Sequence, residues 1–536
     1  MSYRIRRYKA FVSPLVLGLM TGSGACSSID ASDSVMSVDN DGGAPAGGNE
    51  TSDGQTGASG GLGSDESGDG DGDDTPESAG ERDDPPFDDH CGDGQTPIAM
   101  VAADADALAV PVIARTAILL GQEMPANLSL GPRSFLNYYN FDYPPASDRA
   151  ELTVHADLWI DEQGPDDKYQ LQIGIASEAM LNANRPPLHL TIVLDRRTPM
   201  SERTALVDAG LLAVSSSLHS GDRVSLIASG DMPYEILGDH AVSGSNDPRL
   251  VDSAQDFFNA NPIDLEETPL DATIALAYSR AEAGLTTAAT HRILLLTSGH
   301  GEISSETLEL AATHTVGAEG ESIRLVGVGL GTIDSSGDNL VDKLSDAGRG
   351  SSLYATRTDD LVQQLGEQFV RHFVAAATRI KAELILPEGL QPIDIHDADN
   401  SDPQYASTPQ DIQLGPNDTL IFHIDLEQCA DFNSTDSLAV RLRWTDPATS
   451  ETKFEDFPFD LIPDNLSDSR PFVTHKGAAV VAYATALSTV QKNGRAEPLT
   501  LFSAQNKVES ALLLQPQDVD LIEMSTVLAE LDLNAI

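Results

Sequence analysis

The stretch that most constrains the fold of this chain is residues 188–375, where continuous apolar segments alternate with segments of helical periodicity. LHLTIVLD, HRILLLTSG and IRLVGVGLG are apolar almost throughout, instead of at every second position. Strands with this pattern are buried on both faces, as in a parallel sheet that helices cover on each side. Residues 188–375 are therefore predicted to form a doubly wound, Rossmann-like α/β domain.

Segments with a period of two flank this domain and predict antiparallel strands. ELTVHADLWID and KYQLQIGIAS precede it, and RIKAELILPEG, DTLIFHIDLEQ, SLAVRLRWTDP and KFEDFPFDLI follow in residues 376–465. We expect an antiparallel β-sandwich, and the α/β domain is either inserted in it or flanked by it.

Helical segments are predicted at both ends of this folded part. Within residues 93–187, LAVPVIARTAILLGQEMPA predicts a helix with its turn or a short helical hairpin. The aromatic segment RSFLNYYNFDYPP follows and is expected to dock as an extended arm. Residues 466–536 carry apolar residues at helical spacing and predict a helical C-terminal region.

Residues 1–26 have the organisation of a secretion signal: basic residues, the apolar run AFVSPLVLGLM, and small residues that lead to Cys26. The small residues before Cys26 resemble a bacterial lipoprotein signal, although Ser23 stands where that signal has Leu. The resemblance implies export to the cell envelope and lipidation at Cys26. Ser27 suits an outer-membrane lipoprotein, periplasmic or surface-exposed. Simple cleavage that leaves Cys26 free or removes it is the alternative.

Residues 27–92 are rich in Ser, Gly and Asp, and Arg82 is the single basic residue between Ser27 and Asp89. Such a segment buries too little apolar surface to order itself, so a disordered, solvated tether is predicted. The formal net charge of -52 excludes an ordinary nucleic-acid-binding protein. Cys91 and Cys429 lack the spacing of a metal site. They form one disulfide or remain two unpaired thiols.

Three segments place polar residues where strands of the α/β domain end or helices begin, and ligands of open parallel sheets bind beyond the carboxyl ends of the strands. They are VLDRRTPMS, EETPLDATIAL and LLLTSGHGE. Their order and spacing resemble the von Willebrand factor type A (VWA) domain. Residues 95–490 resemble a family of bacterial envelope lipoproteins that carry this domain.

The resemblance implies a metal-ion-dependent adhesion site, in which Asp-x-Ser-x-Ser, a Thr and a further Asp hold a divalent cation. Asp195 and Thr268 stand at the first Asp and at the Thr, and Ser298 replaces the last Asp. Arg197 and Pro199 replace the two Ser. Mg²⁺ needs hard oxygen ligands, whereas Pro199 has no side-chain oxygen and Arg197 adds a permanent positive charge. The site is therefore predicted to be degenerate, without a metal cofactor, and Asp195, Thr268 and Ser298 are its residual candidates.

Two hypotheses account for Arg197. Its guanidinium pairs with Asp195 and takes the place of the ion, or the loop has drifted and both Arg196 and Arg197 point into solvent. A rearranged loop that binds metal through Thr198 and Ser201 is a third possibility, because these residues lie three and six positions after Asp195 instead of two and four.

No catalytic set is recognisable, because TSGHG is not a dyad and GVGLG lacks the spacing of a phosphate loop. We expect a non-enzymatic protein that binds a protein partner through the loops at the carboxyl end of its sheet and meets the membrane only through its lipid anchor. An envelope enzyme or small-ligand binder, and a structural scaffold that acts through the β and helical regions, are the alternatives.

Overall fold

The computed structural model of the chain describes residues 97–100, 108–126, 128–149, 151–160, 168–197, 204–230, 232–261, 269–331, 340–396, 412–430, 437–460 and 471–534. The predicted signal at 1–26 and the predicted tether at 27–92 lie outside these residues. So do Cys26, Cys91, Thr198, Pro199, Ser201 and Thr268.

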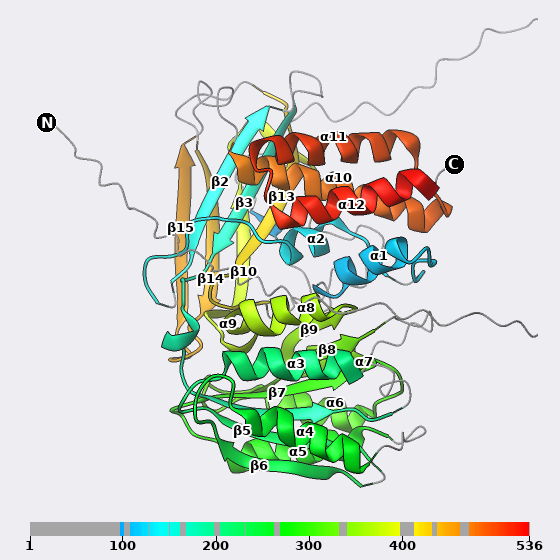
Figure 1. Cartoon of the computed structure of the whole chain (residues 1–536). Coiled ribbons are helices and arrows are strands. Elements are labelled where there is room, and N and C mark those ends of the chain that lie inside the picture. The colour runs from blue at the N-terminus through cyan, green and yellow to red at the C-terminus, as the bar shows by residue number, and fades with distance from the viewer. Residues whose placement is uncertain are drawn as a thin grey trace, which may run out of the picture. The chain divides into compact units, whose positions relative to one another are not determined.

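The α/β domain contains a six-stranded sheet with the order β6-β5-β4-β7-β8-β9 (green in Figure 1). Its strands are β4 (Leu188–Leu194), β5 (Arg223–Ala228), β6 (Tyr234–Ala241), β7 (Thr290–Thr297), β8 (Ile323–Leu330) and β9 (Arg349–Ala355). All pairings are parallel except that of β6, an exposed edge strand that runs antiparallel to β5. Every residue of β7 and β8 is buried, as their continuous apolar pattern predicts.

Helices cover both faces of this sheet, which confirms the doubly wound fold. One face carries α3 (Thr204–Ser217), α4 (Pro248–Ala260), α8 (Thr358–Val362), the π-helical turn Gln363–Glu367 and α9 (Phe369–Phe373). The other carries α5 (Asp271–Ala283), α6 (Ser305–Thr313) and α7 (Leu340–Ala347). The apolar spacing of DDLVQQLGEQFVRHFVAAA (residues 359–377) predicts one long helix after β9. The π-helical turn divides this helix where it packs on α3: the Ser217 hydroxyl donates to the carbonyl oxygen of Leu365 at 3.4 Å.

Two antiparallel sheets form the predicted sandwich. One consists of β1 (Ile98–Met100), β10 (Ala377–Ile385), β14 (Ser437–Thr445) and β15 (Thr452–Asp460), with β12 (Ile412–Leu414) beside β10. The other has the order β11 (Leu390–Ile395), β13 (Thr419–Gln428), β3 (Lys168–Ala176) and β2 (Thr153–Ile160). The two share a core that contains Leu171, Phe422 and Trp444. Strands that precede the α/β domain in the chain pair with strands that follow it, as β3 does with β13. The α/β domain is therefore inserted in the sandwich.

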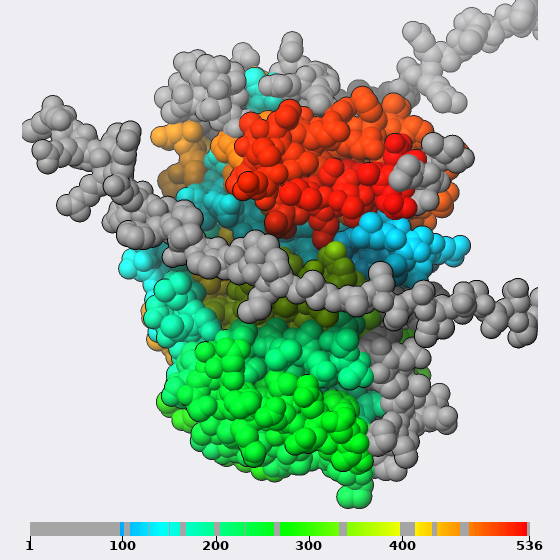
Figure 2. All heavy atoms as spheres, in the orientation of Figure 1, coloured from blue at the N-terminus to red at the C-terminus, as the bar shows by residue number. Residues whose placement is uncertain are grey.

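The predicted C-terminal helices are α10 (Phe472–Asn493), α11 (Pro498–Leu514) and α12 (Val519–Asn534), which lie side by side (Figure 1). Together with α1 (Val110–Leu119) and α2 (Pro132–Tyr138) they pack against the four-stranded sheet at Ala176 and Ile421. Figure 2 shows α10–α12 as a continuous orange and red surface. No helix among the described residues is long and apolar enough to span a membrane.

The extended arm expected at RSFLNYYNFDYPP is wrong in its first half. Pro132 occupies the first turn of α2, where its fixed φ and missing N–H favour a helix. The second half is non-helical, and Tyr139, Phe141 and Tyr143 are buried in the core beneath the C-terminal helices.

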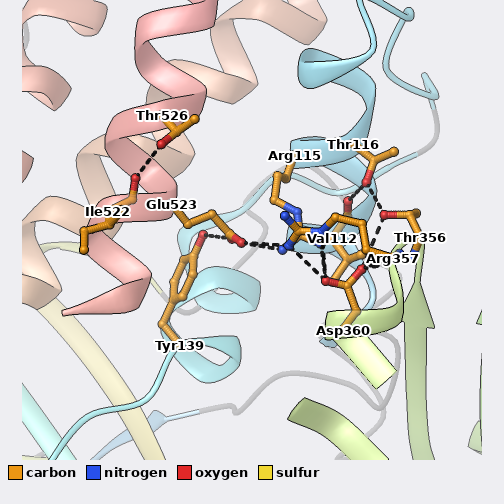
Figure 3. A network of polar contacts seen from close by, with 10 residues as sticks. All are labelled: Val112, Arg115, Thr116, Tyr139, Thr356, Arg357, Asp360, Ile522, Glu523 and Thr526. Atoms are coloured by element: carbon orange, nitrogen blue, oxygen red, sulfur yellow. Dashed lines mark hydrogen bonds and ion pairs between the residues drawn. The ribbon is translucent and has the colours of Figure 1, made fainter. Parts of the chain in front are cut away.

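Figure 3 shows Arg115 of α1 between two carboxylates that come from distant parts of the chain. Its Nη2 donates to Asp360 Oδ1 of α8 at 2.9 Å, and its Nη1 donates to Glu523 Oε2 of α12 at 2.5 Å. Burial raises the pKa of Asp360, but Arg115 and Arg357 lower it by a larger amount, so the pKa lies below the ordinary value. This network fastens α1 and the C-terminal helices to the α/β domain.

We expect Arg115→Met to lower the free energy of unfolding by about 2–3 kcal/mol, because Asp360 stays buried with one cation fewer. The loss is moderate since Arg357 and two backbone N–H groups still donate to this carboxylate. Thr526→Ala is the control, because within the described residues its exposed hydroxyl bonds only to Ile522 of its own helix, and it should change stability by no more than about 0.5 kcal/mol. Equal urea midpoints for the two variants would refute a stabilising network.

Candidate functional site

Asp195 directly follows β4 in the middle of the sheet, where the strand order changes direction between β5 and β7. Its backbone N–H donates to the carbonyl oxygen of Leu296 in β7 at 3.0 Å, and the N–H of Ser229 donates to Leu194 at 2.9 Å. The ends of three strands therefore hold this residue. In open α/β sheets this crevice is the usual ligand position.

The carboxylate of Asp195 forms a two-pronged ion pair with the guanidinium of Arg197. Arg197 Nη2 donates to Oδ2 at 2.6 Å, and Nε lies 2.9 Å from Oδ1 and 3.0 Å from Oδ2. The backbone N–H of Arg197 adds a bond to Oδ1 at 3.1 Å. The Asp195 side chain is 0% exposed and that of Arg197 is 8% exposed, so the pair is buried. Charge-assisted, forked pairs of this kind are the strong ones.

Two hydroxyl groups occupy further acceptor positions on the same carboxylate. Thr297 Oγ1, at the end of β7, donates to Oδ2 at 2.6 Å, and Ser229 Oγ, after β5, lies 3.4 Å from Oδ1. A carboxylate has about four lone-pair positions, and protein donors approach both oxygens here. Thr297 and Ser229 match no ligand position of the VWA resemblance, although each stands at the carboxyl end of a strand beside β4.

The hypothesis that Arg197 pairs with Asp195 agrees with the structure, and the hypothesis that both arginines point into solvent is wrong. Arg196 and Arg197 are each 7% exposed. Arg196 Nη2 donates to the carbonyl oxygen of Asn261 at 2.8 Å, and its guanidinium stacks on Phe257. Gly301, at φ +100°, packs against the guanidinium of Arg197 so closely that a Cβ at this position would clash with Nη1. Packing therefore holds both side chains inward.

Ser298, at the position of the missing last Asp, is 3% exposed, and its hydroxyl has no hydrogen-bond partner within the described part of the chain. Thr268 and Pro199 lie outside the described residues. Across those residues, no three His, Cys, Asp or Glu side chains gather in a way that could hold a metal ion. The described residues do not fit a divalent cation, since the guanidinium of Arg197 stands against Asp195 where the ion would need open oxygens.

The third cysteine of the chain, Cys429, directly follows β13 and is disulfide-bonded. Its partner lies outside the described residues, so the pairing with Cys91 stays a prediction. The two tryptophans, Trp159 and Trp444, are 5% and 1% exposed and belong to the interior of the sandwich region.

No family model matches the sequence, and no curated protein matches it. Among solved structures, the chain is similar to a von Willebrand factor type A protein from Catenulispora acidiphila at 13% identity and a TM-score of 0.41, over 72% of this chain and 98% of that one. It is also similar to the ArnB paralog VWA2 from Sulfolobus acidocaldarius at 15% identity and a TM-score of 0.33, with the same coverage. The chain is similar as well to the pilus adhesin SpaC from Lactobacillus rhamnosus GG, at 13% identity and a TM-score of 0.27, over 58% of this chain and 48% of that one.

The class of the inserted domain follows from its own architecture. The doubly wound sheet, the central strand that ends on Asp195 and the helices on both faces are what the VWA resemblance implied. The inserted domain therefore has the fold of a VWA domain.

Proposed function

We propose that this chain is a non-enzymatic interaction protein whose VWA-type domain binds another protein through the loops at the carboxyl end of its sheet, without a shared divalent metal. The observation that carries the proposal is the buried Arg197–Asp195 pair at the centre of that edge. A metal-dependent domain leaves this carboxylate open for the ion, whereas Arg197 neutralises it permanently. Binding would then rest on surface shape and polar contacts instead of a shared cation.

We further propose that the chain is exported and anchored through a lipid on Cys26, with residues 27–92 as the tether. The support is the sequence alone: the apolar run before Cys26 and the composition of the segment after it. Such an arrangement would present the folded part at a distance from the membrane surface.

Titration of the full chain with Mg²⁺, Mn²⁺ and Ca²⁺ in a calorimeter is expected to show no saturable binding at the Asp195 site. The physical reason is that a dication would have to displace a guanidinium held by three hydrogen-bond contacts at 2.6–3.0 Å. Binding with a micromolar dissociation constant that Asp195→Ala abolishes would overturn the metal-free proposal.

A scaffold that acts through the helical layer is the second candidate, because α11 and α12 expose apolar side chains. These are Leu499, Phe502, Leu513, Leu514, Val519 and Ile522. Truncation after residue 470 does not separate the two candidates, since it removes Tyr483 and Leu487 from the core that also buries Phe135.

Single surface substitutions separate the two candidates. Met232, in the connection from β5 to β6, and Leu513, on α11, are 74% and 83% exposed, so Met232→Asp and Leu513→Asp should both leave the fold intact. We expect Met232→Asp to weaken cross-linking to the partner in envelope preparations and Leu513→Asp to leave it unchanged. The opposite result would favour the scaffold.

A further inference from the structure

A cavity of about 240 Å³ lies between the α/β domain and the sandwich, away from Asp195. Its α/β side comes from the segment after α6 and from the amino ends of β8 and β9. Its sandwich side comes from the start of β10, from β12 and from the turn between β14 and β15. Asp195 stands at the carboxyl end of β4, and β4, β8 and β9 run parallel. The cavity therefore lies at the amino ends of the strands and the proposed interaction surface at their carboxyl ends.

The charged lining of this cavity is dominated by arginine. Among the described residues that line it are Arg324, Arg349 and Arg379, with one carboxylate, that of Asp446. One oxygen of Asp446 is engaged by the backbone N–H groups of Ala448 and Thr449 at 2.8 and 3.3 Å. In a chain with a formal net charge of -52, a cavity with three arginines is a local exception. Guanidinium groups bind carboxylates and phosphates with matched, forked geometry.

Arg324 is buried without enough partners. Its side chain is 9% exposed, and its Nε and Nη1 have no hydrogen-bond partner in the part of the chain described by the structure. Its Nη2 lies 3.6 Å from Glu319 Oε2, but Glu319 also pairs with Arg292, so one carboxylate serves two cations. Buried donors without acceptors are costly, which points to an acceptor that the chain itself does not supply.

The ionisation of Arg324 reflects the same excess of positive charge. Burial lowers its pKa, and Arg292, Arg349 and Arg379 lower it further, whereas Glu319 raises it, with a net result of about 10. An anion beside these groups would relieve the repulsion among them.

The backbone at this cavity is unusual at both exposed arginines. Arg349 and Arg379 have φ of 49° and 52°, in the left-handed region that side-chain-bearing residues seldom adopt. Arg379 lies at a β-bulge of β10, because the register with β12 and with β14 shifts just there. Bulges and strained residues re-aim side chains and are common at binding sites. Ser450, which lines the same cavity, also has a positive φ, of 59°.

We propose that this cavity binds a small oxyanion, a phosphate or polycarboxylate group, through Arg324, Arg349 and Arg379. The anion supplies the acceptors that Arg324 lacks and joins the α/β domain to the sandwich across their boundary. The site is independent of the proposed partner surface, so either can fail without the other.

The test is calorimetric titration of the full chain with inorganic phosphate, sulfate and citrate at matched ionic strength, together with thermal unfolding. We expect saturable binding of at least one of these anions and a rise in Tm with its concentration. Arg349→Asn and Arg379→Asn remove the charge, and asparagine tolerates positive φ. Each should weaken binding roughly tenfold or more, as the loss of a charge-assisted hydrogen bond does.

Arg441→Gln is the matched control, since this arginine lies on the exposed face of β14 and pairs with Asp456. It should bind the anion as the unaltered chain does. Arg324→Gln is expected to abolish anion binding. If the Arg324→Gln variant does not fold, Arg349→Asn and Arg379→Asn test the proposal. Failure of all three anions to bind saturably, or equal binding by Arg379→Asn and the unaltered chain, overturns the proposal. Binding of citrate alone indicates a carboxylate ligand, and binding of phosphate a phosphate group.

Discussion

Replacing Arg197 with alanine is expected to lower the free energy of unfolding by about 3–5 kcal/mol, because it leaves a fully buried carboxylate without its cation. Asp195 is 0% exposed, and the hydroxyls of Thr297 and Ser229 cannot neutralise its charge. Urea denaturation at neutral pH measures the change. This substitution should be among the most damaging single changes at the carboxyl edge of the sheet.

Arg223→Ala is the control for this experiment. Arg223 also pairs with an aspartate, Asp239, but the two side chains are 38% and 60% exposed. Exposed pairs contribute no more than about 1 kcal/mol. If Arg197→Ala were as mild as Arg223→Ala, the Arg197–Asp195 pair would not be the buried counter-ion described above.

A double-mutant cycle separates the pair from its surroundings. Asp195→Asn combined with Arg197→Ala should be less destabilising than the sum of the two single changes, with a coupling of about 2 kcal/mol. Each single variant leaves one charge buried without its partner, whereas the double variant removes both charges. Additive effects would indicate that the two residues act independently.

Rebuilding the ligand set is expected to create metal binding where the unaltered chain has none. Arg197→Ser, Pro199→Ser and Ser298→Asp together restore the Asp-x-Ser-x-Ser and Asp positions that the VWA resemblance implies. They remove the guanidinium, introduce two hydroxyl groups and replace the Ser298 hydroxyl with a carboxylate. We expect Mg²⁺ or Mn²⁺ to bind with a dissociation constant of roughly 10⁻⁴ M or tighter, within the range of oxygen-ligand cation sites.

Two further variants make this gain interpretable. Arg197→Ser alone should not bind the metal, because it removes the competing cation without completing the ligands. Thr268→Ala in the rebuilt chain should weaken binding, since Thr268 stands at the remaining ligand position. A rebuilt chain that stays inert to both metals would mean that the shape of the loops, and not only the identity of the ligands, prevents metal binding.

Much of the fold was accessible from residue patterns because burial leaves a direct periodic signal. β7 and β8 are apolar at most positions and buried at every one, and β14 of the sandwich alternates as a half-buried strand does. The errors occur where a local pattern has two solutions. The aromatic segment after Pro132 begins as a helix, and the helix after β9 is divided at Gln363–Glu367. Pro132 starts a helix in the first case, and contact with α3 accompanies the π-helical turn in the second.

Residue patterns alone predict that an aspartate ends the central strand of a doubly wound sheet, and the VWA resemblance places an arginine where a metal ligand is usual. The sequence left open whether Arg197 points inward, because the direction of a side chain in a loop depends on what packs around it. Gly301 lies against the guanidinium of Arg197, and Thr297 and Ser229 hold the Asp195 carboxylate that the guanidinium meets. The arginine cavity is likewise a property of tertiary structure alone, since Arg324, Arg349 and Arg379 meet only when the inserted domain packs on the sandwich.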